Sequence, residues 1–245
     1  MKAVLLGATK GMGRALARHL AGRGERLFLL GRREDDLRRS ARDLEIRGAE
    51  GTVGTAVCDL LAPGTFEPAL QTADARLGGF DTVVVTAGLF ATQGELENDP
   101  QQTAALLAAD FTNTVLFCEH ARRRLLRRGG GTLCVFSSVA GERGRKPVVL
   151  YGAAKAGLSQ YLEALDHRHR RDGLRVVCVK PGFVDTGMTA GLPAPPFAGD
   201  AQQVARQVHR AITRGKPEVY APAVWRWVMA AIRTLPRGVM RRIEF

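Results

Sequence analysis

Short apolar runs alternate with amphipathic helical patterns along the chain, and this alternation limits the fold more than any other feature. Strands that alternate with helices form a parallel sheet with helices packed on both of its faces. We therefore expect an α/β, doubly wound fold of the Rossmann type with a mainly parallel seven-stranded sheet. The expected strands are residues 2–6, 26–30, 52–57, 81–86, 132–137, 174–179 and 217–220. The expected helices are residues 11–23, 33–47, 65–77, 99–128, 149–172 and 200–214.

The length of 245 residues fits a single domain over residues 1–245, because no linker or internal repeat divides the chain. The cysteines lie among apolar neighbours and lack metal-ligand spacing, so we expect buried free thiols and no metal site. They are Cys58, Cys118, Cys134 and Cys178. The chain enters its first expected strand without a signal peptide, and no apolar run is long enough to span a membrane. We therefore expect a cytoplasmic protein.

The formal net charge of +12 raises the question of nucleic-acid binding. The arginines are spread over expected helix faces, as in residues 122–128 and 167–171, and no nucleic-acid-binding motif accompanies them. A solvated basic surface explains this charge better, so we expect no nucleic-acid partner.

A glycine-rich segment follows the first expected strand and opens the first expected helix. Glycines at such a junction allow a tight turn, and the amides of the helix N-terminus then point at a bound pyrophosphate. Their spacing differs from the G-x-G-x-x-G fingerprint, and a plain strand-to-helix turn remains the alternative. The dinucleotide-binding residues expected here are Gly7, Thr9, Lys10, Gly11, Met12 and Gly13.

Tyr151 and Lys155 are spaced to share one face of an expected helix. The lysine ammonium favours the tyrosinate, so we expect it to lower the pKa of the phenol from about 10. The hydroxyl of Ser138 would hold a carbonyl oxygen while the phenol protonates it. The phenol would thus act as a general acid in the reduction of a ketone. An ordinary surface pair has the same spacing, so this interpretation depends on the hydride source that the glycine-rich segment implies.

Together these motifs resemble the classical short-chain dehydrogenase/reductase family over nearly the whole chain. Ser138, Tyr151 and Lys155 match its catalytic positions, and Thr86-Ala87-Gly88 matches its Asn-Ala-Gly turn with the asparagine replaced. Besides the glycine-rich segment, the resemblance implies cofactor contacts at Asp59, Leu60, Ala87, Gly88, Tyr151, Lys155, Pro181, Gly182, Val184 and Thr186.

One position departs from the family in a way that affects the proton relay. The family's fourth catalytic residue is an asparagine that helps hold a water linking the lysine to solvent, and Asp110 occupies the matching position here. An aspartate can also accept a hydrogen bond from that water, so we expect Asp110 to be the fourth catalytic residue. Asn113 lies on the same helical face one turn further along and is the alternative.

The end of the second expected strand bears on the choice of cofactor. An acid at this place binds the ribose 2′-hydroxyl of NAD, whereas an arginine accommodates the 2′-phosphate of NADP. Gly31 stands where the acid would be, Arg32 and Arg33 follow it, and Lys10 adds a basic residue in the glycine-rich segment. These residues favour NADP(H), with NAD(H) as the alternative.

A narrower resemblance concerns the substrate. Residues 138–155 and 215–237 are similar to the actinobacterial decaprenylphosphoryl-2-keto-ribose reductases, which reduce the 2-keto group of a lipid-linked sugar. We therefore expect NADPH-dependent reduction of a ketone, with a lipid-linked 2-keto sugar as candidate substrate. A steroid, acyl or small soluble ketone is the alternative substrate, and a non-catalytic cofactor-sensing regulator is the alternative function.

Two segments near the C-terminus suggest contacts outside the core. Residues 187–200 are rich in proline and glycine and are expected to form a substrate lid. Residues 222–245 combine two tryptophans with five arginines, which suits peripheral contact with the anionic inner face of a membrane. A helix that covers the core or a subunit contact would explain the same pattern. A homodimer built on residues 110–128 and 150–170 is the expected assembly.

Overall fold

The computed structural model describes residues 1–187, 191 and 197–243. Its sheet has seven strands in the order β3-β2-β1-β4-β5-β6-β7, and every neighbouring pair is parallel. The strands are β1 Lys2–Leu6, β2 Arg26–Gly31, β3 Gly54–Val57, β4 Thr82–Val85, β5 Gly131–Phe136, β6 Leu174–Pro181 and β7 Glu218–Ala221. The expected fold class is confirmed, because the strand order reverses between β1 and β4 as in a doubly wound sheet.

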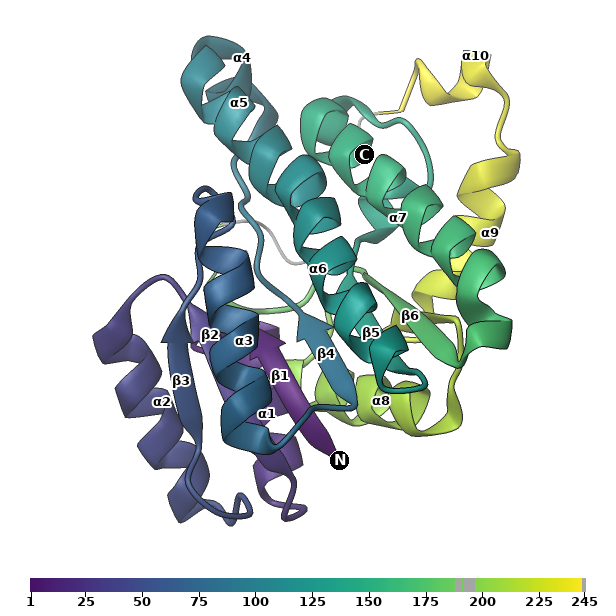
Figure 1. Ribbon diagram of the computed structural model, residues 1–245. Helices are drawn as coiled ribbons and strands as arrows, with labels where there is room; N and C mark the ends of the chain where they lie inside the picture. The colour runs from purple at the N-terminus through teal and green to yellow at the C-terminus, as the bar shows by residue number, and fades with distance from the viewer. Residues whose placement is uncertain (188–190, 192–196, 244–245) are drawn as a thin grey trace.

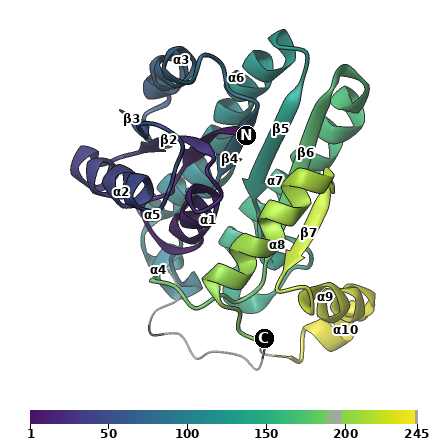
Figure 2. The same ribbon diagram turned by 90° about the horizontal axis from the view of Figure 1, so that it is seen from below.

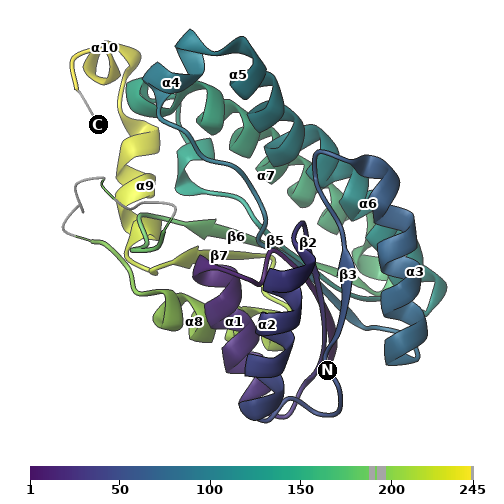
Figure 3. The same ribbon diagram turned by 90° about the vertical axis from the view of Figure 1, so that its left-hand side faces the viewer.

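Helices cover both faces of the sheet (Figures 1 and 3). One layer contains α1 Gly11–Ala21, α2 Glu34–Ile46 and α8 Ala201–Arg214, and the other contains α3 Phe66–Leu77, α6 Asn113–Arg127 and α7 Val149–His169. Alternate strand residues face opposite layers. In β1, for example, Val4 packs with the α3 and α6 core and Leu5 packs with the α1 and α8 core.

Shorter elements complete the structure. They are α4 Gln93–Asn98, α5 Pro100–Leu107, α9 Trp225–Thr234, α10 Arg237–Met240, the π-helical turn η2 Ala108–Thr112, and the 3-10 helices η1 Pro63–Thr65, η3 Val139–Gly141, η4 Lys146–Val148 and η5 Arg170–Asp172. Within the described ranges, no helix is both long and apolar enough to cross a membrane.

The prediction of a single helix over residues 99–128 is wrong, because the structure divides this segment into α5, η2 and α6. Asp99 caps α5 by accepting from the amides of Gln101 and Gln102. The Thr114 hydroxyl donates to the Ala109 carbonyl across the wide turn, at 2.7 Å. This π-helical turn carries Asp110, whose side chain is fully buried.

The C-terminal segment packs beside β7 at the edge of the sheet (Figure 2). The side chains of Trp225, Met229 and Ile232 are buried on one face of α9 against Val139 and Tyr220. Trp227 projects from the opposite face of α9 and is 74% exposed. The α9 helix therefore covers part of the core and leaves Trp227 in solvent.

Candidate functional site

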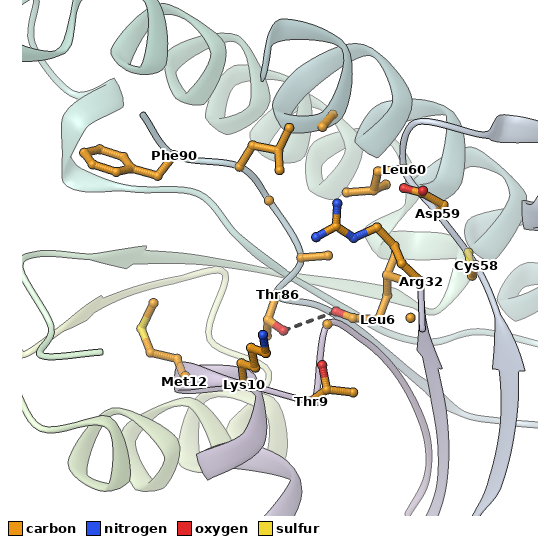
Figure 4. Close-up of a pocket in the computed structure, with 18 of the residues that line it drawn as sticks. Leu6, Thr9, Lys10, Met12, Arg32, Cys58, Asp59, Leu60, Thr86 and Phe90 are labelled. Carbon is orange, nitrogen blue, oxygen red and sulfur yellow. Dashed lines mark hydrogen bonds between the residues drawn. The ribbon is translucent and has the colours of Figure 1, made fainter. Parts of the chain in front are cut away.

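A cavity of about 560 Å³ lies at the carboxyl ends of β1, β2, β3 and β4 (Figure 4). Ligands of doubly wound folds bind at this place, outside the strand ends at the reversal of strand order. The cavity is lined by Leu6, Gly7, Thr9, Lys10, Gly11, Met12, Gly13, Gly31, Arg32, Cys58, Asp59, Leu60, Leu61, Thr86, Ala87, Gly88, Leu89, Phe90, Ala109, Thr186 and Gly187. The expected residues of the glycine-rich segment all lie on its wall.

The glycines of this segment are required by its backbone. Gly7 has φ 98° and Gly11 has φ 51°, in the region that favours glycine. A Cβ atom at Gly13 would lie 2.3 Å from the Gly7 carbonyl oxygen and 2.4 Å from Thr86 Oγ1. Only glycine therefore lets the start of α1 approach the loop this closely.

The start of α1 suits an anion. Among the described residues, no side chain caps this helix, and its first turn contains no acid. Its amides therefore point at the cavity with the positive end of the helix dipole. Arg14 holds the loop by donating to the Thr9 carbonyl at 2.8 and 2.5 Å. The cavity, the glycine cradle and this helix end fit the diphosphate of a nicotinamide dinucleotide.

The two arginines after β2 lie in different places. Arg32 points into the cavity, and Lys10 lies on the same wall (Figure 4). The Arg33 side chain is 73% exposed and pairs with Asp36 at 3.5 Å, so it does not line the cavity. The sequence analysis assigned both Arg32 and Arg33 to the cofactor, because a sequence pattern does not show the direction of a side chain. Successive side chains at a strand end point in different directions.

Residues at the ends of β3 and β4 complete the cavity wall. The carboxylate of Asp59 accepts from the Leu61 amide at 3.0 Å, which fixes the loop that carries Leu60. The hydroxyl of Thr86 donates to the Leu6 carbonyl at 3.2 Å and so joins the ends of β4 and β1. Thr86 occupies the position where the resembled family has an asparagine.

Ser138, Tyr151 and Lys155 meet where η3 packs against α7. Ser138 lies close enough to the Tyr151 hydroxyl to lower the pKa of the phenol slightly, and the Lys155 ammonium lies 5.5 Å from the centre of the Tyr151 ring. Gly141 lets η3 pack closely against α7, because a Cβ atom at this position would lie 2.6 Å from the Lys155 backbone. The Tyr151 ring also contacts Phe90, a cavity residue, with 5.3 Å between ring centres. The three expected catalytic residues thus adjoin the cavity.

Asp110 extends this group from the other side. Its Oδ2 atom lies 3.1 Å from Lys155 Nζ, and its Oδ1 atom accepts from the Leu89 amide at 2.6 Å. Asn113, the alternative, donates instead to the Leu60 carbonyl at 2.7 Å. Asp110 rather than Asn113 therefore contacts the lysine.

Lys155 lowers the pKa of the Tyr151 phenol, as expected, but the net shift of this pKa is upward. Burial raises the pKa of Tyr151, and Asp110 raises it further, against the opposing effects of Lys155 and Ser138. Burial lowers the pKa of Lys155, but Asp110 and Tyr151 outweigh that effect and raise it above the usual value. The free site therefore holds a phenol beside an ammonium–carboxylate pair.

The loop after β6 approaches the cavity from the far side. Thr186 lines the cavity, whereas Pro181, Gly182 and Val184, also expected to contact the cofactor, are not among the lining residues. A Cβ atom at Gly182 would lie 2.1 Å from the Trp225 ring, so the tryptophan rests directly on this glycine. Of the expected lid at 187–200, residues 188–190 and 192–196 lie outside the described residues.

A charged network beneath this loop was missed by sequence reasoning. Lys180 pairs with Glu142 at 2.5 Å and with Glu218, and the Tyr220 hydroxyl donates to Glu142 at 2.8 Å. Ser137 was also missed, although its hydroxyl donates to the Lys155 carbonyl at 2.9 Å. No motif marks these residues, because their partners come from distant segments of the chain.

No group of three or more histidine, cysteine or acidic side chains that could hold a metal ion occurs in the described part of the chain. All four cysteines are free and buried, as expected.

This chain is similar to known oxidoreductases over most of its length. The model of the short chain dehydrogenase family matches residues 1–195. An uncharacterised oxidoreductase of Mycobacterium tuberculosis is 34% identical over 98% of this chain and 96% of its own length. Carbonyl reductase family member 4 of Danio rerio is 30% identical over 78% of each chain.

Among solved structures, an actinorhodin polyketide ketoreductase variant with NADPH superposes with a TM-score of 0.80 at 23% identity. The match covers 89% of this chain and 95% of that one, and at this identity it shows a shared fold. The family model covers most of the chain and agrees with the full-length relative. The protein belongs to the short-chain dehydrogenase/reductase family and is an oxidoreductase with a dinucleotide-binding fold.

Proposed function

We propose that this protein reduces a ketone to a secondary alcohol with NADPH. The observation that carries the proposal is the meeting of Ser138, Tyr151 and Lys155 beside a cavity that fits a dinucleotide. When bound, the cofactor supplies the hydride. The chain holds the substrate oxygen with Ser138, donates a proton to it from the Tyr151 hydroxyl, and binds the cofactor's nicotinamide ribose with Lys155.

Substitution of the phenol tests the reaction. Tyr151→Phe keeps the ring and its contact with Phe90, so NADPH binding should persist while turnover falls by about two orders of magnitude or more. Tyr161→Phe is the matched control, because Tyr161 lies on the same helix and donates to Glu119 at 2.7 Å. Oxidation of NADPH by a panel of ketones gives the rates. Near-normal turnover by Tyr151→Phe contradicts the proposal, whereas NADPH binding without turnover of any ketone favours the cofactor-sensing regulator.

The preference for NADPH over NADH rests on two cations in the cavity. Arg32 and Lys10 line it, and β2 ends in Gly31 without the acid that would bind a ribose hydroxyl. Arg32→Asp should narrow or reverse the ratio of the two dissociation constants, whereas Arg33→Asp should change it little. Equal affinity of the wild type for the two cofactors would defeat this preference.

A lipid-linked 2-keto sugar is the proposed substrate. The support comes from the resemblance of residues 138–155 and 215–237 to keto-ribose reductases, and from the apolar side chains of Leu96, Leu106 and Leu150 packed beside Tyr151. The competing substrates are steroid, acyl and small soluble ketones. A polyprenyl-linked 2-keto sugar should give the highest kcat/KM in the panel, and a higher value for a soluble ketone would displace it.

The exposed face of α9 is proposed to contact an anionic membrane surface. Trp227 is 74% exposed, and Arg226, Arg237, Arg241 and Arg242 are exposed in the same C-terminal segment. An arginine near anionic lipid contributes about 1 kcal/mol, so a few suffice for reversible binding. Trp227→Ala should weaken sedimentation with anionic vesicles, whereas Ile46→Ala, which removes an exposed side chain elsewhere, should not. Equal behaviour of the two variants would reject this contact.

A homodimer through α6 and α7 is the proposed assembly. Phe111, Leu116 and Val149 are exposed apolar side chains at or near these helices, and a dimer would cover them. Light scattering should give twice the chain mass, and Leu116→Glu should give the mass of one chain. A monomeric wild type would contradict this assembly.

A further inference from the structure

Asp110 places a carboxylate where the resembled family has a neutral amide. The side chain has no exposed surface; its Oδ1 atom accepts a hydrogen bond from the Leu89 amide at 2.6 Å, and its Oδ2 atom forms an ion pair with the Lys155 ammonium at 3.1 Å. The backbone leaves room for it at Gly88, where a Cβ atom would come within 3.0 Å of Asp110 Oδ1. The carboxylate is therefore a fixed part of the site.

Few other groups act on the phenol and the ammonium. The titratable groups that face Lys155 are Asp110 from η2, Tyr151 from its own helix and Cys178 from β6. Tyr151 faces Lys155 and Asp110, and Ser138, the residue before η3, acts on its hydroxyl. The charges in contact are thus one ammonium and one carboxylate, which largely cancel.

This cancellation decides the protonation state of the phenol. An isolated ammonium near a phenol favours the tyrosinate, and a nearby carboxylate favours the neutral phenol. With the ammonium opposed by this carboxylate at 3.1 Å, burial is the largest effect on the phenol, and burial also favours the neutral form. A neutral amide at position 110 would leave the ammonium unbalanced.

We propose that Asp110 is a positioning residue that balances the charge of Lys155 and thereby keeps Tyr151 a phenol, ready to donate its proton, into the alkaline range. The proposal rests on the proposed function, because a ketone reductase needs Tyr151 in its protonated form. The site is thus built as a proton donor, and loss of the carboxylate narrows the pH range in which it can donate.

The tyrosine content of the chain permits a direct test without substrate. There are three tyrosines, and burial, together with the bond to Glu142, raises the pKa of Tyr220 to about 12. Burial also raises the pKa of Tyr161, with Cys118 and Glu119 adding to the effect. The tyrosinate absorbance is recorded after rapid mixing to each pH, so that ionisation is read before alkaline unfolding. The signal lost in Tyr151→Phe belongs to Tyr151.

In the wild type, Tyr151 should ionise above pH 10, the ordinary value for tyrosine. In Asp110→Asn, which keeps the shape of the side chain, the ionisation should move down by about one pH unit or more. Asp59→Asn is the matched control, because it removes one negative charge from the same cavity wall without touching Lys155, and it should leave the Tyr151 ionisation in place.

Wild-type ionisation well below pH 10 overturns the proposal even if Asp110→Asn does not fold. A folded Asp110→Asn that titrates like the wild type, or like Asp59→Asn, overturns it as well. Ketone reduction is then followed against pH in the same variants, and its alkaline limb should move down with the titration in Asp110→Asn. A shifted titration without turnover of any ketone rejects the proposed function alone, and turnover without a shifted titration rejects the role of Asp110 alone.

Discussion

Replacement of Lys180 by methionine should destabilise the protein and disturb the loop that carries Ser138. The Lys180 side chain is 10% exposed and pairs with Glu142, which is 6% exposed. Removing one partner of a buried pair costs about 3 to 5 kcal/mol, because the other charge is left without compensation. We expect about 3 kcal/mol, the lower end of that range, because Glu142 keeps its contacts with Tyr220 and Arg233.

Urea unfolding measures this loss. A decrease of about 3 kcal/mol lowers the unfolding midpoint by about 1 M for a chain of this size. The double variant Lys180→Met/Glu142→Gln should recover part of the loss, because it no longer buries an unpaired carboxylate. Ketone turnover should fall in the single variant, since Glu142 follows η3 directly. A midpoint close to that of the wild type, or strictly additive effects in the double variant, would refute the reasoning.

Three further predictions follow from single side chains. Gly13→Ala should weaken NADPH binding at least tenfold in a fluorescence titration, because its Cβ atom would lie 2.3 Å from the backbone of the glycine-rich segment. Gly94→Ala, in open space, should bind NADPH normally, and equal affinities of the two variants would contradict the role of this segment in cofactor binding. Trp225→Ala should cost about 3 kcal/mol of unfolding free energy, and exposed Trp227→Ala less than about 0.5 kcal/mol; equal losses would contradict the packing of α9. Burial raises the pKa of Glu142, but its ammonium and phenol partners outweigh burial and lower it. Its carboxylate therefore stabilises the fold above the usual glutamate value of about 4.3 and loses that effect as the pH falls below it, so the stability gap between wild type and Glu142→Gln should close in acid. A gap that persists unchanged in acid would contradict this sign.

The fold and the approach of Tyr151 to Lys155 were predictable because their signals are local. The apolar runs that become strands are contiguous, and the spacing of Tyr151 and Lys155 is one helical turn. The glycine pattern at residues 7–13 is local as well, since it reports the backbone that a tight strand-to-helix turn requires. Periodicity and turn chemistry therefore sufficed for these features.

The features that sequence reasoning missed depend on contacts between distant segments. The upward shift in the Tyr151 pKa comes first from burial and then from Asp110, which lies 41 residues before Tyr151 and contacts Lys155 from a π-helical turn. Lys180 meets Glu142 across 38 residues. Such charges look like solvated residues in a sequence, and only the packed structure shows which of them are buried together.

Transfer of deuterium tests the central claim most directly. NADPH carrying deuterium at the transferable position of the nicotinamide is incubated with each ketone, and the alcohol is analysed by mass spectrometry. The wild type should place deuterium on the former carbonyl carbon of at least one ketone, while Tyr151→Phe should form at most about one hundredth as much labelled alcohol in the same time. Absence of labelled alcohol from every ketone class, with NADPH bound to the wild type, would contradict the assignment of this protein as a ketone reductase.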